Sequence, residues 1–157
     1  MTLPSGQLVL LDTDVLIHLA RNDSDGKALE ARYKLSSRTE RPLYSTITEG
    51  ELRAFAKYRN WGPEKLHRLD SILSQLVRTE ASLPQVVEAY ADLYAAARRG
   101  GHPHQKQNDL WIAATAKAAD AVVLTADRDF EWMHPEFVRV IRVLPTQDGS
   151  RTNRSLP

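Results

Sequence analysis

Short apolar runs alternate with helix-like segments along the chain, and this alternation limits its fold more than any other feature. The runs lie at residues 7–12, 42–46, 76–81, 121–125 and 138–143. AVVLT and VRVIRV are rich in β-branched residues, which favour strands, whereas LVRTEA is equally compatible with a helix end or a loop. Strands separated by helices are typical of a parallel sheet with helices on its faces. The sequence therefore predicts an α/β fold with a mainly parallel sheet flanked by helices.

Three of the intervening segments have a clear helical pattern. Residues 84–99 place apolar side chains three and four positions apart, with Pro84 in the first turn. Residues 108–119 are apolar almost all round, which predicts a buried helix. Residues 62–76 open with Gly-Pro and alternate apolar and charged residues at helical spacing, so we expect a surface helix there.

Composition narrows the class of protein. Hydrophobic residues make up 42% and charged residues 26% of 157 residues, which predicts one globular domain, here over 7–144, with polar, flexible termini at 1–6 and 145–157. The absence of cysteine excludes disulfides and thiolate zinc sites and fits a cytoplasmic location. No apolar run approaches the roughly 18 residues of a membrane span. With a net charge of +1, nucleic-acid binding must depend on local clusters of basic residues.

Carboxylates stand where predicted strands end and predicted helices begin. Asp12 ends the first strand, at the edge where open parallel sheets bind ligands, although turn or cap chemistry would also explain it. Asp14 lies closer to the following helical run, so we expect it to be the helix cap. Asp109 opens the apolar helix, where capping is again an alternative explanation. Asp127 follows another strand, and turn chemistry accounts for Asp129 beside it.

Glu51 is the most informative acid of the segment STITEGELRAFAKY. At about 100° per residue, it falls in the middle of an apolar arc. The arc consists of Ile47, Ala54, Phe55 and Tyr58. A carboxylate on a core-facing stripe has a desolvation cost that requires a partner, whereas Glu49 points the other way and can be solvated. The alternative is a helix at the edge of the domain, from which Glu51 reaches water.

A parallel sheet would bring these acids together at one edge. The predicted cluster consists of Asp12, Glu51, Asp109 and Asp127. Two like charges about 4 Å apart repel by roughly 4 kcal/mol at an effective dielectric constant of 20, so shared protons or a divalent cation must neutralise them. A cluster of oxygen ligands suits Mg²⁺ or Mn²⁺, and such a site is well suited to phosphoryl chemistry.

Four segments together resemble one family of nucleases. LLDTDVLIHL, STITEGELRAF, QNDLWIAATAKAADAVVLTADRDF and the closing VRVI are similar, in order and spacing, to PIN-domain nucleases. Within that family, they resemble the VapC-type toxins of toxin–antitoxin pairs. The resemblance covers residues 8–143 and implies a single PIN-like domain with a parallel sheet between helices.

The resemblance implies a role for each acid. It makes four acids the catalytic and metal-binding residues: Asp12, Glu51, Asp109 and Asp127. It also implies that four neighbouring residues contact and orient these acids: Thr13, Asp14, Asn108 and Thr125. The family often has Asn or Ser at the position of Asp14, so this extra carboxylate either caps the helix or holds a second ion.

The implied activity is Mg²⁺-dependent hydrolysis of RNA, with Mn²⁺ as an alternative ion. The implied protein is a toxin that acts as a homodimer and is silenced by a cognate antitoxin. The basic segment 98–106 leads into Asp109, so it either steers phosphates toward the acids or is an ordinary solvated loop.

Three alternatives remain open at this stage. One is a stand-alone PIN-domain ribonuclease without an antitoxin, which would share the same acids. A second is a haloacid-dehalogenase-type phosphatase, because Asp12-Thr13-Asp14 resembles its nucleophile motif. That motif has Thr or Val two residues after its second Asp, where this chain has Leu16. The third is an inert scaffold that binds RNA or protein, although such a scaffold is expected to lose its carboxylates.

Overall fold

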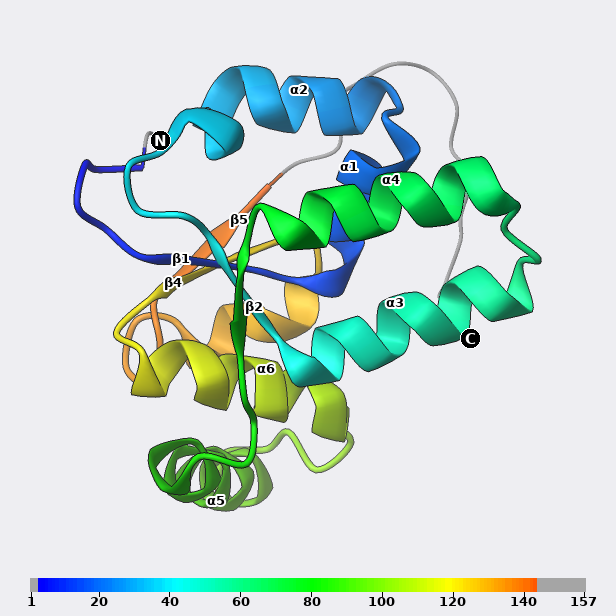
Figure 1. The fold of residues 1–157 in the computed structure, drawn as a ribbon. Coiled ribbons are helices and arrows are strands. Elements are labelled where there is room, and N and C mark those ends of the chain that lie inside the picture. Colours follow the sequence, from blue (N-terminus) through cyan, green and yellow to red (C-terminus); the bar gives the residue numbers. More distant parts are fainter. Residues whose placement is uncertain (1–2, 144–157) are drawn as a thin grey trace.

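A five-stranded parallel sheet forms the centre of the protein (Figure 1). The computed structural model describes residues 3–143. The strands are β1 (Val9–Leu11), β2 (Leu43–Ser45), β3 (Val77–Thr79), β4 (Val122–Thr125) and β5 (Val140–Arg142). They are arranged in the order β3-β2-β1-β4-β5, and every neighbouring pair is parallel. All five predicted strands are confirmed, including LVRTEA, whose assignment the sequence left open.

Helices cover both faces of this sheet. They are α1 (Thr13–Arg21), α2 (Ser24–Tyr33), α3 (Thr46–Tyr58), α4 (Pro63–Ser74), α5 (Pro84–Arg99) and α6 (Gln107–Ala118), with short 3-10 helices η1 (Leu35–Ser37) and η2 (Arg128–Met133). Figure 1 shows α1–α4 on one side of the sheet and α5 and α6 on the other. The three helices predicted from the sequence correspond to α4, α5 and α6. No helix within residues 3–143 is long and apolar enough to cross a membrane.

Two apolar cores result from this layered arrangement, and β1 contributes to both. Leu11 packs into the core under α1–α4, whereas Leu10 packs into the core under α5, α6 and η2. Side chains alternate along a strand, so a central strand buried on both faces consists entirely of apolar residues. Fully burying one leucine stabilises the fold by about 1.5–3 kcal/mol. These cores fix the ends of β1 and β4, where the candidate site lies.

The ends of the chain were predicted to be flexible at residues 1–6 and 145–157. Residues 1–2 and 144–157 lie outside the described part of the chain. Within the described part, Leu3 packs against the core under α1–α4, and the Pro4 carbonyl accepts a hydrogen bond from Arg38 at 3.1 Å. This short segment therefore contacts the domain.

The strand order reverses direction at β1. The chain runs from β1 to β2 and β3 on one side, and then returns to β4 on the other side of β1. The carboxyl ends of β1 and β4 are thus the point where the order reverses, which is where open α/β sheets bind ligands. The Asp12 amide donates a hydrogen bond to the Leu124 carbonyl at 3.0 Å, which fixes these two ends side by side.

The predicted buried face of α3 is wrong in part. Phe55 is buried as expected, but Ala54 is exposed and Tyr58 is 69% exposed. The helix instead buries Thr48, Leu52, Phe55 and Ala56. Apolar character alone does not decide burial on this helix, because the short hydroxyl side chain of Thr48 packs inward. Glu51 consequently lies at the border of the buried face, half-buried, rather than at its centre.

Candidate active site

Asp12 is held by two elements at once. It is the N-cap residue of α1, where its Oδ1 accepts a hydrogen bond from the Thr13 amide at 2.7 Å. Its Oδ2 accepts from the Thr125 hydroxyl at 2.7 Å, across the junction between β1 and β4. The pKa of Asp12 is raised to about 6, mainly by burial and in part by the charges of Glu51 and Asp127, against the lowering by the hydrogen bonds from Thr125 and Thr13.

The expectation that Asp14 caps the helix is wrong. Asp12 occupies the cap position, because α1 begins at Thr13, immediately after the strand. Asp14 lies in the first turn, where Oδ1 accepts from the Val15 amide at 2.7 Å and Oδ2 accepts from the Ala126 amide at 3.1 Å. Burial, followed by the charge of Asp12, raises the pKa of Asp14 well above its usual value. Asp14 therefore ties α1 to the chain just after β4.

Glu51 has the partners that its desolvation requires. Its Oε1 accepts from the Thr13 hydroxyl at 2.6 Å, and its Oε2 accepts from the Asn108 amide at 3.2 Å. The side chain thus joins three helices, α1, α3 and α6, and does not simply reach into water.

Glu49 lies in a different environment from Glu51 on the same helix. It pairs with Arg78 at 2.7 Å and with Arg53 at 3.2 Å. Hydrogen bonds from these guanidinium groups hold its pKa below the usual range. Glu49 is therefore an ion-paired surface acid, distinct from the candidate site.

Asp109 lies buried at the start of α6. Its side chain lies in the first turn and is only 8% exposed, while Lys106 occupies the N-cap position, so capping does not explain Asp109. Its pKa is raised to about 7, mainly by burial and in part by the charges of Asp12, Asp127 and Glu51, against the opposing charge of Lys106. Its Oδ2 accepts a hydrogen bond from the Gln105 side-chain amide at 3.1 Å.

Asp127 and Asp129 complete the acidic edge. Asp127 caps η2 by accepting from the Asp129 amide at 2.9 Å, and its own amide donates to the Thr125 hydroxyl at 3.0 Å. Carboxylate oxygens of Asp109, Asp127 and Asp129 lie within 4.8 Å of one another. The Lys106 ammonium lies 3.7 Å from Asp129 and 3.9 Å from Asp127.

Two further residues, Asp129 and Gln105, lie beside the predicted acids and were not among the residues predicted from the sequence. The spacing of Asp127 and Asp129 could have indicated that both belong to the site, because a helical turn that begins just after a strand can place both side chains on the same side. Nothing in the sequence around Gln105 indicated that its amide would reach Asp109, since that contact depends on how the loop before α6 folds.

The four predicted acids share one electrostatic environment. Asp12 is repelled by Glu51 and Asp127, and Asp109 is repelled by all three. The potential ligands are carboxylate oxygens, and two of these acids carry pKa values raised by burial among like charges. These donors fit a hard divalent cation such as Mg²⁺ or Mn²⁺, which would offset the mutual repulsion.

The basic segment before α6 is anchored to η2. The His102 ring stacks on Trp132, with ring centroids 4.5 Å apart and planes 14° apart. The Trp132 indole N–H donates to the Gln105 side-chain oxygen at 2.8 Å. Arg98 lies over the Tyr94 ring at 5.0 Å, while His104 and Lys106 remain exposed. Of the basic side chains of this segment, Lys106 thus lies beside the acids, 3.7 Å from Asp129.

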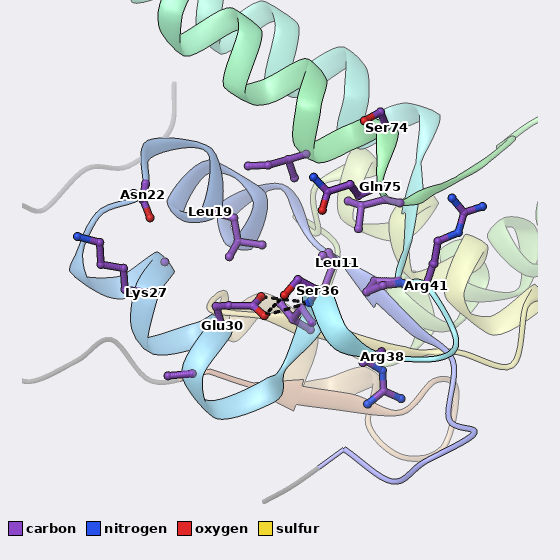
Figure 2. A pocket seen from close by; sticks show the side chains of 16 residues that line it. Leu11, Leu19, Asn22, Lys27, Glu30, Ser36, Arg38, Arg41, Ser74 and Gln75 are labelled. Carbon is purple, nitrogen blue, oxygen red and sulfur yellow. Dashed lines mark hydrogen bonds between the residues drawn. The ribbon is translucent and has the colours of Figure 1, made fainter.

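A hollow of about 770 Å³ lies between α2 and α4, away from the acids (Figure 2). Its apolar lining comes from Leu11, Leu19, Leu35, Ile72 and Leu76. Lys27, Arg38 and Arg41 also line it, and Glu30 accepts hydrogen bonds from Ser36 beside them. None of the candidate site acids lines this hollow.

The sequence matches the PIN domain family over residues 9–133. This match covers most of the chain, and the protein therefore belongs to the PIN-domain family. Together with the parallel sheet, it confirms the predicted fold. A comparison with curated proteins gave no match.

Several solved structures have a similar fold. One is FitAcB from Neisseria gonorrhoeae, with 29% identity, a TM-score of 0.70, and coverage of 86% of this chain and 97% of that chain. Another is VapBC-5 from Mycobacterium tuberculosis, a member of the VapBC family of toxin–antitoxin systems, with 25% identity, a TM-score of 0.66, and coverage of 87% and 98%. VapBC2 from Rickettsia felis has 20% identity, a TM-score of 0.71 and coverage of 87% and 98%, and this match bears on the fold alone. The chain is thus similar to VapC-type PIN domains.

Proposed function

We propose that this protein is a Mg²⁺-dependent endoribonuclease that acts as the toxin of a toxin–antitoxin pair. The observation that carries the proposal is the gathering of buried, mutually repelling carboxylates at the carboxyl ends of β1 and β4. The residues proposed to hold the cation are Asp12, Glu51, Asp109 and Asp127. A divalent cation bound by these acids would polarise a phosphate oxygen and lower the pKa of an attacking water.

The groups around these acids fix their orientation. Thr125 donates to Asp12 and accepts from the Asp127 amide, so a single hydroxyl aligns two of the acids. Thr13 and Asn108 do the same for the two oxygens of Glu51. Such orientation reduces the movement needed when the cation binds, because the ligands already point in fixed directions.

RNA is the proposed substrate because the chain is similar to VapC-type PIN domains. The exposed Lys106 lies near Asp109 and provides favourable charge for a phosphate backbone. Membership of the PIN family argues against the phosphatase alternative. Retention of all four acids argues against an inert scaffold. A stand-alone ribonuclease without an antitoxin is the remaining alternative.

The proposed activity is tested by removing the cation. We expect the purified protein to cleave single-stranded RNA in the presence of Mg²⁺, and excess EDTA to abolish cleavage, because uncompensated carboxylates repel a phosphate. Adding back Mg²⁺ or Mn²⁺ in excess over the chelator should restore it. The measurement is electrophoresis of end-labelled RNA, with a DNA of the same sequence alongside. Cleavage that persists at full rate in EDTA would contradict the metal-dependent mechanism.

An antitoxin is the proposed partner, since two of the structural relatives are VapBC complexes. We propose that it docks in the hollow between α2 and α4, where an apolar floor carries the cationic side chains Lys27 and Arg41 at its rim. An apolar segment with acidic flanks would complement this surface in shape and charge.

The toxin assignment is tested by growth. We expect expression in a host without antitoxin to arrest growth. Co-expression of the antitoxin, taken as the product of a small reading frame next to the gene, should restore growth. The double variant Lys27→Glu/Arg41→Glu should still arrest growth but lose this rescue, because reversed rim charge repels the partner while the acids remain intact. Lys57→Glu, an exposed lysine outside the hollow, is the control and should be rescued normally. Full expression of the parent without any growth defect would favour the stand-alone ribonuclease.

A further inference from the structure

A chain of hydrogen bonds joins η2 to Asp109 through a side chain that has no assigned role. The Trp132 indole N–H donates to the Gln105 side-chain oxygen at 2.8 Å, and the Gln105 side-chain nitrogen donates to Asp109 Oδ2 at 3.1 Å. Trp132 and Gln105 are both partly buried, and Asp109 is buried. The two hydrogen bonds therefore lie at the boundary of the candidate site, partly shielded from water.

The direction of the Gln105 amide is determined by its two neighbours. An indole N–H can only donate, so it requires the amide oxygen on its side. An ionised carboxylate can only accept, so it requires the amide nitrogen on the other side. Both requirements are met by one orientation of the amide, and the reversed orientation would lose both hydrogen bonds. Trp132 thus determines which atom of Gln105 faces Asp109.

Trp132 is itself held in place by ring contacts. One face stacks on His102, and Phe137 packs edge-on with ring centroids 5.7 Å apart and planes at 63°. Trp132 belongs to η2, which begins at the Asp127 cap. The same short helix therefore positions Asp127 directly and Asp109 through Gln105, so acids from two separate elements share one rigid support.

We propose that Gln105 is a positioning residue that orients the Asp109 carboxylate for the cation, and that Trp132 sets the orientation of Gln105. This inference rests on the proposed metal-dependent function. A carboxylate with one oxygen fixed by an amide presents its other oxygen in a defined direction. Groups that orient a metal ligand in this way typically change metal affinity by about 10- to 100-fold when removed. We expect an effect of that size from Gln105.

The test compares three variants of the full-length protein. Gln105→Leu keeps the bulk of the side chain but removes both hydrogen bonds, and Trp132→Phe keeps an aromatic ring against His102 but removes the indole N–H. Gln107→Leu, an exposed glutamine two residues further on, is the matched control. We expect Gln105→Leu to weaken Mn²⁺ binding about 10- to 100-fold in calorimetric titrations. Trp132→Phe should have a smaller effect, because the Gln105 side-chain amide is still present but can rotate. Gln107→Leu should bind Mn²⁺ like the parent.

A second measurement is independent of the cation. In the metal-free protein, the Trp132 indole N–H resonance should shift and exchange faster with water in Gln105→Leu, but not in Gln107→Leu. The melting temperatures of the variants should stay close to that of the parent. A lower melting temperature with unchanged Mn²⁺ affinity would instead indicate a purely structural role. If the Trp132 resonance or the Mn²⁺ affinity of Gln105→Leu equals that of the parent, the positioning role is wrong.

The outcomes separate this inference from the function on which it rests. If the parent binds Mn²⁺, Asp12→Asn does not, and Gln105→Leu binds like the parent, only the positioning role fails. If the parent itself binds no Mn²⁺ and cleaves RNA without a cation, both proposals fail.

Discussion

Asp12→Asn is expected to lower the rate of Mg²⁺-dependent RNA cleavage by at least about 100-fold. Losing a group that only orients a metal ligand typically costs 10- to 100-fold, so losing the charge of a proposed ligand should cost at least as much. The fold should survive, because Asn has the same size and can still accept from the Thr13 amide. Its side-chain nitrogen can donate to the Thr125 hydroxyl, which is able to accept as well as donate.

The control for this variant is Glu49→Gln. It removes a carboxylate from the same domain, but from an acid that pairs with Arg78 and Arg53 outside the site. Partly exposed ion pairs contribute little, about 0–1 kcal/mol, so this variant should fold and cleave like the parent. The measurement is kcat/KM on a fluorescent RNA, with circular dichroism as the check on folding. Equal cleavage by Asp12→Asn and the parent would mean that Asp12 is not part of the mechanism.

Residues at strand ends were the part of the site that sequence could predict. A parallel sheet brings the carboxyl ends of its strands to one edge, so Asp12 and Asp127 followed directly from the order of strands and helices. Asp109 followed because a carboxylate at the start of an apolar helix is buried when that helix packs on the sheet. These inferences need only the fold class, which local apolar patterns determine.

Details that depend on single-residue offsets were beyond the sequence. The helix cap is Asp12 and not the predicted Asp14, because Asp12 is the single residue between the end of β1 and the start of α1. The buried face of α3 turned toward Thr48, because packing against neighbouring helices rather than side-chain polarity selects the face. Gln105 was unpredictable for a third reason: its contacts with Trp132 and Asp109 join segments whose relative position is set only by the complete fold.

Asp109→Asn is expected to abolish cation binding and, at the same time, to stabilise the metal-free protein at pH 8. The pKa of Asp109 is raised from 3.8 to about 7 in the folded state. Between these values the folded protein holds a proton that the unfolded chain has lost, so the stability of the parent falls as pH rises from about 4 to 7. Above pH 7 the full cost of the buried charge is present, about 4 kcal/mol for a shift of this size. Asn carries no charge and avoids this cost.

The pH profile provides the sharpest check, because the parent should lose stability relative to Asp109→Asn from about pH 4, where the unfolded chain ionises, to about pH 7, where the folded protein ionises. In EDTA, urea denaturation should show that the stability advantage of Asp109→Asn over the parent is clearly larger at pH 8 than at pH 5. Asp12, with its pKa near 6, should still make the variant lose some stability across this range. An equal stability difference at both pH values would contradict a buried, ionising Asp109.

Adding Mn²⁺ should reverse the order of stability at pH 8. A ligand that binds only the folded state stabilises it by RT ln(1 + [L]/Kd), and ionised acids bind the cation more tightly than protonated ones. The parent should therefore gain stability with Mn²⁺, and gain more at pH 8 than at pH 5, while Asp109→Asn should gain little. The instability of the metal-free site at neutral pH and its affinity for the cation then have one origin, since both arise from carboxylates forced together at the edge of the sheet.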